Sequence, residues 1–423
     1  MDKTRGERPG LMKKVIVVGG GAAGMMAAAK AREMGAEVTL LEKNKRLGKK
    51  MLITGKGRCN ITNAGTLEDI IKNIPGNGQF LYSALSKFSN QDVIEFFHRL
   101  GVATKVERGG RVFPQSDRAL DVVEAFSQYL RKIGVIIKYE TKVEELSVSG
   151  EKVQGVIAAG GRFFPADRVI VATGGASYPG TGSTGDGYTL AAKTGHHIIP
   201  LKPSLVPLET LEPWVKDVQG LSLKNVRAKA FAGEKVLADE FGEMLFTHFG
   251  ISGPIILSLS RPVAEYLRTT GQPVRVSIDL KPALTPEQLD LRVQRDFQKY
   301  SRKYLANAFP DLLPKSLIPV FLRILPIAKE KYVHQITKEE RGQIVQLLKN
   351  LTLTVTKTRS LAEAIVTAGG VSLKEINPKT MESRIVSGLY FAGEVLDIDG
   401  FTGGYNLQAA FSTGYVAGQA AAE

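Results

Sequence analysis

The sequence has almost no cysteine, few aromatic residues and no long hydrophobic run. A single cysteine, Cys59, among 423 residues excludes an internal disulfide and a cysteine-based metal cluster, and it favours a reducing compartment. No apolar run approaches the ~18 residues of a membrane-spanning helix. The apolar residues near the N-terminus belong to a strand and a turn, and not to a signal peptide. We therefore expect a cytoplasmic protein without a membrane span and without a metal site.

Aromatic residues make up 7% of the chain, whereas lysine and arginine give it a net charge of +14 and a pI of about 9.6. Such a charge is compatible with nucleic acid, an anionic membrane or an acidic substrate. The basic residues are scattered, however, and are not interleaved with aromatic residues as in a groove for single-stranded nucleic acid. A lysine-coated surface is the simpler interpretation, and we do not expect nucleic acid as the main partner. The sequence specifies no oligomeric state.

The chain is organised around residues 13–42. An apolar run at 15–18 is followed by the glycine-rich turn 19–24, an Ala/Met-rich segment and a second apolar run at 38–41 that ends in Glu42. This order is typical of strand, turn, helix and strand. A strand that is apolar at every position is buried on both faces, as in a parallel sheet. Residues 1–11 are polar, and we expect the fold to begin at Met12.

The turn matches the dinucleotide-binding pattern G-x-G-x-x-G at Gly19, Gly21 and Gly24. The first glycine permits the sharp turn, the second lets a pyrophosphate approach the backbone, and the third lets helix and strand pack closely. Free N–H groups at the start of the helix would bind the phosphates. Glu42 lies 18 positions after Gly24, near the ~20 expected for a carboxylate that binds ribose. The stretch therefore predicts a dinucleotide site.

Amphipathic helices and short strands follow. Helices are expected at 90–100 and, after a cap-like Ser116, at 117–133. Apolar extended runs then predict strands at 135–139, 143–148, 153–158 and 168–172, with a hairpin at 149–151. The last strand leads into Thr173-Gly174-Gly175.

A second G-x-G-x-x-G pattern occurs at 180–187, and it could be taken for a nicotinamide site. Its glycines do not turn directly out of a strand, and no strand ending in an acidic residue follows at the required distance. We therefore predict that it binds no nicotinamide dinucleotide and that it shapes a loop instead. Asp186 resembles a cap for a helix at 187–194.

Prolines 200, 203, 207 and 213 indicate a domain boundary. Strands are expected beyond it at 225–231, 236–239, 244–247 and 274–280. Helices are expected to start at the capping-box patterns 285–288 and 337–340. We predict a first part of a cofactor domain at 1–194 and an inserted domain at 195–360. The insert would be β-rich at 195–283 and helical at 284–350, and the cofactor domain would resume at 361–423.

The C-terminal stretch completes the cofactor motif. Residues 388–394 form an apolar strand that ends in Glu394, Asp397 follows, and Gly403-Gly404 opens a final helix. Together with the turn at 19–24 and the stretch at 172–187, this pattern resembles the glutathione-reductase-like FAD superfamily. The stretch 172–187 is similar to its fumarate reductase and aspartate oxidase branch.

More narrowly, TGKGRCNITN, GEMLFTHFGISGP, VTAGGV and AGEVLDIDGFTGGYNLQAA resemble the aminoacetone-oxidase-like family of FAD-binding proteins of the BaiN/YhiN type. The resemblance spans nearly the whole chain from Met12. It implies an α/β fold class, with a discontinuous Rossmann-like FAD-binding domain built on a parallel sheet plus a β-meander. A β-rich and helical domain would be inserted into it. It also implies non-covalently bound FAD.

The resemblance assigns parts of the cofactor to parts of the chain. The turn would hold the pyrophosphate, Glu42 the adenosine ribose, Val143 the adenine and Glu394 the ribityl chain or phosphates. The start of the last helix would meet the pyrimidine end of the flavin, where N–H donors favour the negative charge of the reduced ring. The full predicted cofactor set is Gly19, Gly21, Ala22, Ala23, Gly24, Glu42, Lys43, Gly57, Arg58, Cys59, Asn60, Val143, Ala172, Thr173, Gly174, Gly393, Glu394, Asp397, Gly404, Tyr405, Asn406, Leu407 and Gln408.

Two functions follow from these features. The first is an FAD-dependent oxidoreductase that transfers a hydride between flavin N5 and a small or alicyclic organic substrate, with NAD(P)H as a candidate transient donor. The second is a flavoprotein that modifies or binds nucleic acid such as tRNA, for which a basic, aromatic-bearing arm on the insert would be the diagnostic feature. The candidates for substrate contact or proton transfer are His248, Tyr178 and Tyr405.

Overall fold

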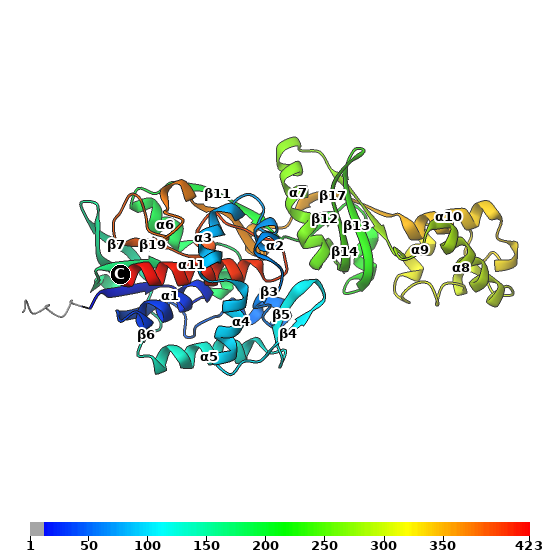
Figure 1. Cartoon of the computed structure of the whole chain (residues 1–423). Coiled ribbons are helices and arrows are strands. Elements are labelled where there is room, and N and C mark those ends of the chain that lie inside the picture. The colour runs from blue at the N-terminus through cyan, green and yellow to red at the C-terminus, as the bar shows by residue number, and fades with distance from the viewer. Residues whose placement is uncertain (1–11) are drawn as a thin grey trace, which may run out of the picture. The chain divides into compact units, whose positions relative to one another are not determined.

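The computed structural model describes residues 12–423, which form two compact units (Figure 1). The first unit comprises the described residues up to Lys202 together with Ile365–Glu423, and the second is Pro203–Ala364. The expectation for residues 1–11 lies outside the described residues. The domain limits given above, at 194/195 and 360/361, stay a prediction.

The first unit is built on a five-stranded parallel sheet with the order β6-β2-β1-β10-β19. Its strands are β1 (Lys14–Val18), β2 (Glu37–Leu41), β6 (Ile136–Lys138), β10 (Arg168–Val171) and β19 (Leu389–Phe391). The predicted burial of the first strand on both faces is confirmed, because Val15 to Val18 are at most 5% exposed. The strand order reverses between β1 and β10. Ligands bind at such a switch point, at the carboxyl ends of the strands.

Two helices of small residues pack closely beside this switch point. They are α1 (Ala22–Glu33) and α11 (Tyr405–Ala422), which run together in Figure 1. A Cβ atom on Gly414 would lie 2.3 Å from the carbonyl oxygen of Ala23, and one on Gly418 would lie 2.3 Å from that of Ala27. The glycines therefore set the close approach of the two backbones.

The remaining helices of the first unit show which start signals can be predicted from the sequence. For the helix expected at 90–100, a capping box at Ser89 starts α4 (Asn90–Arg99). The expected cap at Ser116 is wrong, because α5 (Ala119–Lys132) has Arg118 at its N-cap position and no side-chain cap. Phe97 and Phe126 pack edge to face between these two helices. The other helices are α2 (Leu67–Lys72), α3 (Tyr82–Lys87) and α6 (Asp186–Lys193).

Three small sheets complete the first unit. The predicted meander is β7 (Val143–Ser149), β8 (Lys152–Ala158) and β9 (Arg162–Pro165), of which β9 was not foreseen. The sheet β3-β5-β4 was not foreseen either, since its strands are short. They are β3 (Thr62–Asn63), β4 (Thr104–Glu107) and β5 (Arg111–Pro114). A two-stranded pair joins β11 (Ile198–Ser204) to β18 (Val366–Val371).

The second unit contains a closed six-stranded barrel with the order β12-β15-β14-β13-β16-β17. The strands are β12 (Leu208–Thr210), β13 (Ser222–Ala232), β14 (Lys235–Thr247), β15 (Gly250–Ser252), β16 (Val274–Asp279) and β17 (Leu351–Thr358). The helix α7 (Pro254–Thr270) packs on the barrel. Separate strands at 236–239 and 244–247 were a wrong prediction, because both belong to the continuous β14.

A helical part lies between β16 and β17 in the chain. It contains α8 (Pro286–Lys299), α9 (Ile318–Ile324) and α10 (Lys338–Lys349). Both predicted capping boxes are present, with Thr285 and Thr337 accepting the third backbone N–H of their helices. The β-rich and helical character predicted for the insert is therefore confirmed.

Candidate cofactor site

The glycine-rich turn lies at the switch point, and each glycine has its own steric reason. Gly19 has φ +103°, and a Cβ atom there would lie 2.6 Å from the carbonyl oxygen of Ala172 at the end of β10. A Cβ atom on Gly24 would lie 1.8 Å from the Gly19 carbonyl oxygen. One on Gly21 would have no described atom within 4 Å. Gly19 and Gly24 are thus required by the fold, whereas the space beside Gly21 is left open.

The start of α1 provides donors beside that open space. The first amide bonded within the helix is that of Met25, which donates to the Gly21 carbonyl at 2.9 Å. The N–H groups of Ala22, Ala23 and Gly24 precede this bond and are therefore free of helical acceptors. Such N–H groups, aided by the helix dipole, bind phosphate. The predicted pyrophosphate residues have the geometry that this role needs.

Glu42 directly follows β2 and is 7% exposed. Its carboxylate accepts hydrogen bonds from the Gly20 N–H at 2.7 Å, the Asn44 N–H at 2.7 Å and the Asn44 side-chain amide at 2.7 Å. A carboxylate has about four lone-pair positions, so one remains for a further donor such as a ribose hydroxyl. The Thr141 N–H also donates to the Glu42 carbonyl at 2.9 Å, which brings the start of β7 near this end of the sheet.

The second glycine-rich loop lies against the segment that follows Glu42. Gly182 has φ +102°, and a Cβ atom there would lie 2.4 Å from the Asn44 side-chain nitrogen. Lys43 forms an ion pair with Asp186 at 2.6 Å. This pairing lowers the pKa of Asp186, against the opposing effect of its burial, which is the larger single influence. Asp186 is therefore not the helix cap we expected, and Gly185 occupies the N-cap position of α6.

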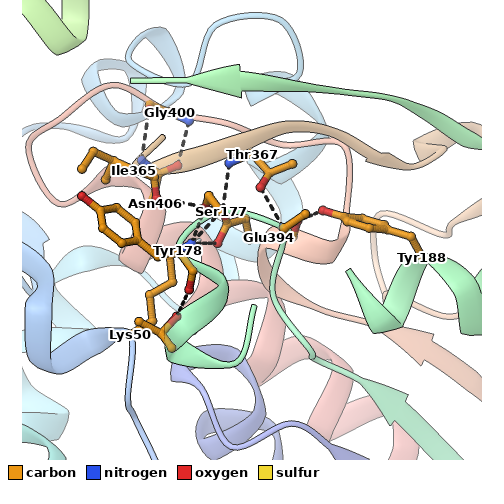
Figure 2. A network of polar contacts seen from close by, with 11 residues as sticks. Lys50, Ser177, Tyr178, Tyr188, Ile365, Thr367, Glu394, Gly400 and Asn406 are labelled. Carbon is orange, nitrogen blue, oxygen red and sulfur yellow. Dashed lines mark hydrogen bonds and ion pairs between the residues drawn. The ribbon is translucent and has the colours of Figure 1, made fainter. Parts of the chain in front are cut away.

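Glu394 is the centre of a polar network at the end of β19 (Figure 2). Its carboxylate accepts from Lys50 Nζ at 2.8 Å, from the Ser177 hydroxyl at 3.3 Å and from the Thr367 N–H at 2.9 Å. The Tyr188 hydroxyl donates to the Glu394 backbone carbonyl at 3.2 Å, and burial raises the pKa of this phenol. The predicted acid is thus held in a fixed position beside a lysine.

Lys50, Ser177 and Thr367 were not among the predicted site residues. Lys50 belongs to the basic loop after Glu42, so the sequence contained a signal that positive charge lies near the cofactor. Its partner Glu394 is 344 positions away. No local pattern could identify that pair.

The start of α11 is shaped by Gly404. Gly404, its N-cap residue, has φ +98°, and a Cβ atom there would lie 2.3 Å from the Thr62 carbonyl oxygen. The Gln408 N–H donates to the Gly404 carbonyl at 3.0 Å, so the N–H groups of Tyr405, Asn406 and Leu407 precede the first helical bond. These donors are the ones predicted to face the pyrimidine end of the flavin.

Two side chains of this segment have structural partners. Asn406 forms hydrogen bonds with both the N–H and the carbonyl of Gly400, each at 2.8 Å. Gln408 is 0% exposed and bonds to Thr62 and Ser412. The Gln408 side chain is therefore engaged within the protein and does not support the predicted contact with the cofactor.

The loop at 57–60 divides into residues with different surroundings. The Arg58 guanidinium pairs with Glu107 and with Asp117, and it stacks 4.0 Å from the centre of the Phe113 ring. The hydrogen bond to Arg58 lowers the pKa of Glu107. The neighbouring Asn60 has a buried side-chain oxygen without a hydrogen-bond partner among residues 12–423. Gly57 adopts φ +84° in this loop.

Cys59 is 0% exposed, and burial raises the pKa of its thiol to about 12. At pH 8 the reactive thiolate is then on the order of one part in ten thousand of the native population. We expect no reaction of the folded protein with Ellman's reagent over several minutes and one thiol per chain after denaturation. We also expect the flavin to stay in the supernatant after acid precipitation. Rapid labelling of the native protein, or flavin in the pellet, would contradict this prediction.

Three further predicted cofactor residues, Thr173, Gly393 and Asp397, follow strands β10 and β19 in the chain. The buried Thr173 hydroxyl, just after β10, has no hydrogen-bond partner in the described part of the chain. The Gly393 N–H donates to the Thr413 hydroxyl at 3.0 Å. Burial raises the pKa of Asp397, whose carboxylate accepts from Asn77 at 3.1 Å.

The cofactor FAD fits the residues that are present. The turn is open beside Gly21, the starts of α1 and α11 carry free N–H groups, and Glu42 is oriented with one free acceptor position. Two buried polar atoms, on Asn60 and Thr173, lack protein partners in the described range. A buried polar atom without a partner is costly unless a ligand or water satisfies it.

The candidate catalytic residues belong to both units. Tyr178 has φ +51° and lies in the group drawn around Glu394 (Figure 2). Tyr405 is the first residue of α11, and burial raises the pKa of its phenol. His248 lies between β14 and β15 of the second unit, with its ring edge to face against Phe249 at 4.9 Å. The catalytic assignments stay predictions.

Residues 13–420 match the family described as HI0933-like protein Rossmann domain. The chain belongs to this family. The match confirms the predicted resemblance, the Rossmann-like FAD-binding fold and an FAD-dependent oxidoreductase as the class of protein.

Two curated relatives cover nearly the whole chain. A 3-dehydro-bile acid delta(4,6)-reductase from Clostridium scindens is 37% identical over 94% of this chain and 96% of its own length. A ribosomal RNA dihydrouridine synthase from Haemophilus influenzae is 34% identical over 92% of this chain and 93% of its own length.

Among solved structures, the fold is similar to that of a 3-ketosteroid-delta4-(5alpha)-dehydrogenase from Rhodococcus jostii RHA1. The TM-score is 0.52 at 17% identity, with 99% of this chain and 98% of that one covered. A 3-ketosteroid delta1-dehydrogenase from Sterolibacterium denitrificans gives a TM-score of 0.54 at 13% identity, covering 97% and 100%. These two similarities concern the fold. No helix among the described residues is long and apolar enough to cross a membrane.

Proposed function

We propose that the protein reduces a carbon–carbon double bond conjugated to a carbonyl group in a small or alicyclic organic substrate. The observation that carries this proposal is the pair of relatives above, whose names describe the reduction of an unsaturated bile acid and the formation of dihydrouridine. In both names the product is a hydrogenated form of an unsaturated ring. The proposal further assigns the protein to the cytoplasm.

When bound, FAD would supply a hydride from its N5 position, and NAD(P)H is the proposed donor that would reduce the FAD. The chain's own residues then have three tasks. The N–H groups at the start of α1 would bind the pyrophosphate, and Glu42 would bind the adenosine ribose. The N–H groups of residues 405–407 stabilise negative charge at the pyrimidine end of the flavin.

The third task is to supply a proton to the carbon next to the carbonyl group. Tyr405 is our candidate because it is the first residue of α11, the helix start that is proposed to face the flavin. Its phenol is protonated at neutral pH, and burial raises its pKa further. Tyr178 and His248 are the other candidates. A protonated side chain within hydrogen-bond reach of the substrate is what this step requires.

A second candidate function is the modification of RNA. It is favoured by the name of the relative at 34% identity and by the net charge of +14. The two functions share the chemistry at the flavin. They differ in whether the double bond that is reduced belongs to a small organic molecule or to a base of an RNA.

The test is anaerobic stopped-flow spectroscopy of the purified FAD-loaded protein. We expect NADH or NADPH to bleach the flavin absorbance, and a cyclic enone such as a 3-oxo-4-ene steroid acid to restore it under anaerobic conditions. A uridine-containing RNA serves as the parallel substrate. If neither enone nor RNA reoxidises the reduced flavin while molecular oxygen does, the proposed reduction is wrong.

A further inference from the structure

The helical part of the second unit exposes a row of three rings, Tyr304, Tyr332 and His334, here called the tyrosine platform. The segments that carry these rings run antiparallel. The Leu305 N–H donates to the Lys331 carbonyl at 2.9 Å, and the Val333 N–H donates to the Lys303 carbonyl at 3.0 Å. Side chains alternate in such a ladder. Leu305 and Val333 point into the core, whereas Tyr304 and Tyr332 are 44% and 39% exposed.

The rings of the platform are held in a row. The centroids of Tyr304 and Tyr332 lie 4.6 Å apart, and the Tyr332 hydroxyl donates to that of Tyr304 at 3.3 Å. His334 stacks on Tyr332 at 5.6 Å and is held by the Ser301 carbonyl at 3.0 Å. Tyr304 keeps 44% of its surface exposed although Tyr332 covers one side. Large exposed rings that are already ordered lose little entropy when a further ring stacks on them.

Positive charge surrounds the platform. Arg302 and Lys303 directly precede Tyr304 and are exposed, and exposed Lys329 lies on the other segment. Two further lysines nearby are neutralised, since Lys299 pairs with Asp311 and Lys331 with Glu340. Lys329 approaches Glu330 at 3.7 Å, with both side chains more than 60% exposed. The net charge of the side chains beside the rings is therefore positive.

We infer that the tyrosine platform is a binding surface for single-stranded RNA. An unpaired base would stack on the exposed face of Tyr304, whose ring is tilted by 36° from that of Tyr332, and phosphates would pair with Arg302 and Lys303. Exposed rings beside basic side chains are the arrangement that single-stranded nucleic acid requires, because every base has a face that can stack. The scattered distribution of basic residues along the sequence concealed this arrangement. The inference deepens the second candidate function, the modification of RNA, and does not depend on the proposed reduction of a small organic substrate.

The experiment measures the fluorescence anisotropy of a labelled 12-nucleotide single-stranded RNA titrated with the FAD-loaded protein at several salt concentrations. We expect Tyr304→Ala and Tyr332→Ala each to weaken binding about tenfold, as for the loss of one stacked base. Tyr304→Phe and Tyr332→Phe keep a ring and should bind like the wild type. Lys303→Gln should lower the slope of log affinity against log salt by about one.

The matched control is Tyr82→Ala, which removes a tyrosine that is 56% exposed in the first unit. This variant should bind RNA like the wild type. Thermal melting and FAD content check that every variant is folded. The inference is overturned if the alanine variants bind as tightly as the wild type, which is the result expected of a surface for a protein partner. It is also overturned if Tyr82→Ala or the phenylalanine variants lose as much affinity, or if the wild type does not bind RNA. Flavin reduction by NAD(P)H is measured separately, so failure of the proposed reduction is distinguishable.

Discussion

Alanine at Gly21 is expected to abolish retention of FAD while leaving the fold of the apoprotein intact. A Cβ atom there would have no described protein atom within 4 Å, so the folded chain can accommodate it. It would instead project into the open space beside the free N–H groups at the start of α1, where the pyrophosphate is proposed to bind. We expect FAD affinity to fall by at least about a hundredfold, since the N–H donors and the phosphates can no longer approach.

The matched variant is Gly24→Ala, in the same turn. Its Cβ atom would lie 1.8 Å from the Gly19 carbonyl oxygen, so the backbone must shift. We expect the free energy of unfolding to fall by about 3 kcal/mol or more, because such overpacking cannot be relieved by a side-chain rotation. Thermal melting of the apoproteins and titration with FAD measure both effects. Equal melting temperatures for the two variants, or tight FAD binding by Gly21→Ala, would contradict the assignment of the turn.

Alanine at Gly404 is expected to disturb the start of α11 and with it the flavin. Gly404 has φ +98°, and a Cβ atom would lie 2.3 Å from the Thr62 carbonyl oxygen and 2.4 Å from the carbonyl carbon. Both the left-handed backbone at Gly404 and its close contact with β3 exclude a side chain. We expect a loss of several kcal/mol of stability, together with a shifted flavin absorbance in any protein that still binds FAD.

The variant Gly271→Ala separates the two causes of the expected stability loss, the strained backbone and the steric contact with β3. Gly271 also lies at a helix end with positive φ, +67°, but a Cβ atom there would have no described atom within 4 Å. That variant should lose only about 1 kcal/mol, as for backbone strain alone, and its flavin spectrum should be unchanged. If Gly404→Ala melts at the same temperature as Gly271→Ala and has the wild-type spectrum, the close approach of α11 to β3 does not position the cofactor.

The first half of the cofactor site could be read from local sequence. A strand that is apolar at every position is buried on both faces, and a glycine-rich turn followed by an Ala-rich helix has few alternatives. The same local logic located α8 and α10 from their capping boxes, because a cap involves residues three positions apart. Helix α4 was located from its apolar face alone. The cap that was predicted from a single serine, Ser116, is wrong.

The barrel shows where local logic ends. Gly242 lies between the two strands predicted at 236–239 and 244–247, but the chain continues through it as the single β14. Its φ of +154° is instead part of a continuous strand, and a Cβ atom there would lie 2.9 Å from Ile255 of α7. A glycine in a strand can mark a close approach as well as a turn. Only the packing of α7 on the barrel shows that Gly242 marks a close approach and not a turn.

The sequence by itself determined the switch-point turn, the acid that follows β2, the free helix start at α11 and the family to which the chain belongs. Only the tertiary structure decided that Lys50 pairs with Glu394, that Gly182 lies against Asn44, and that Tyr304 and Tyr332 form one exposed row. The reason is physical. Periodicity, caps and glycine turns depend on neighbours within a few residues, whereas the partner of a charge or a ring depends on how distant segments pack.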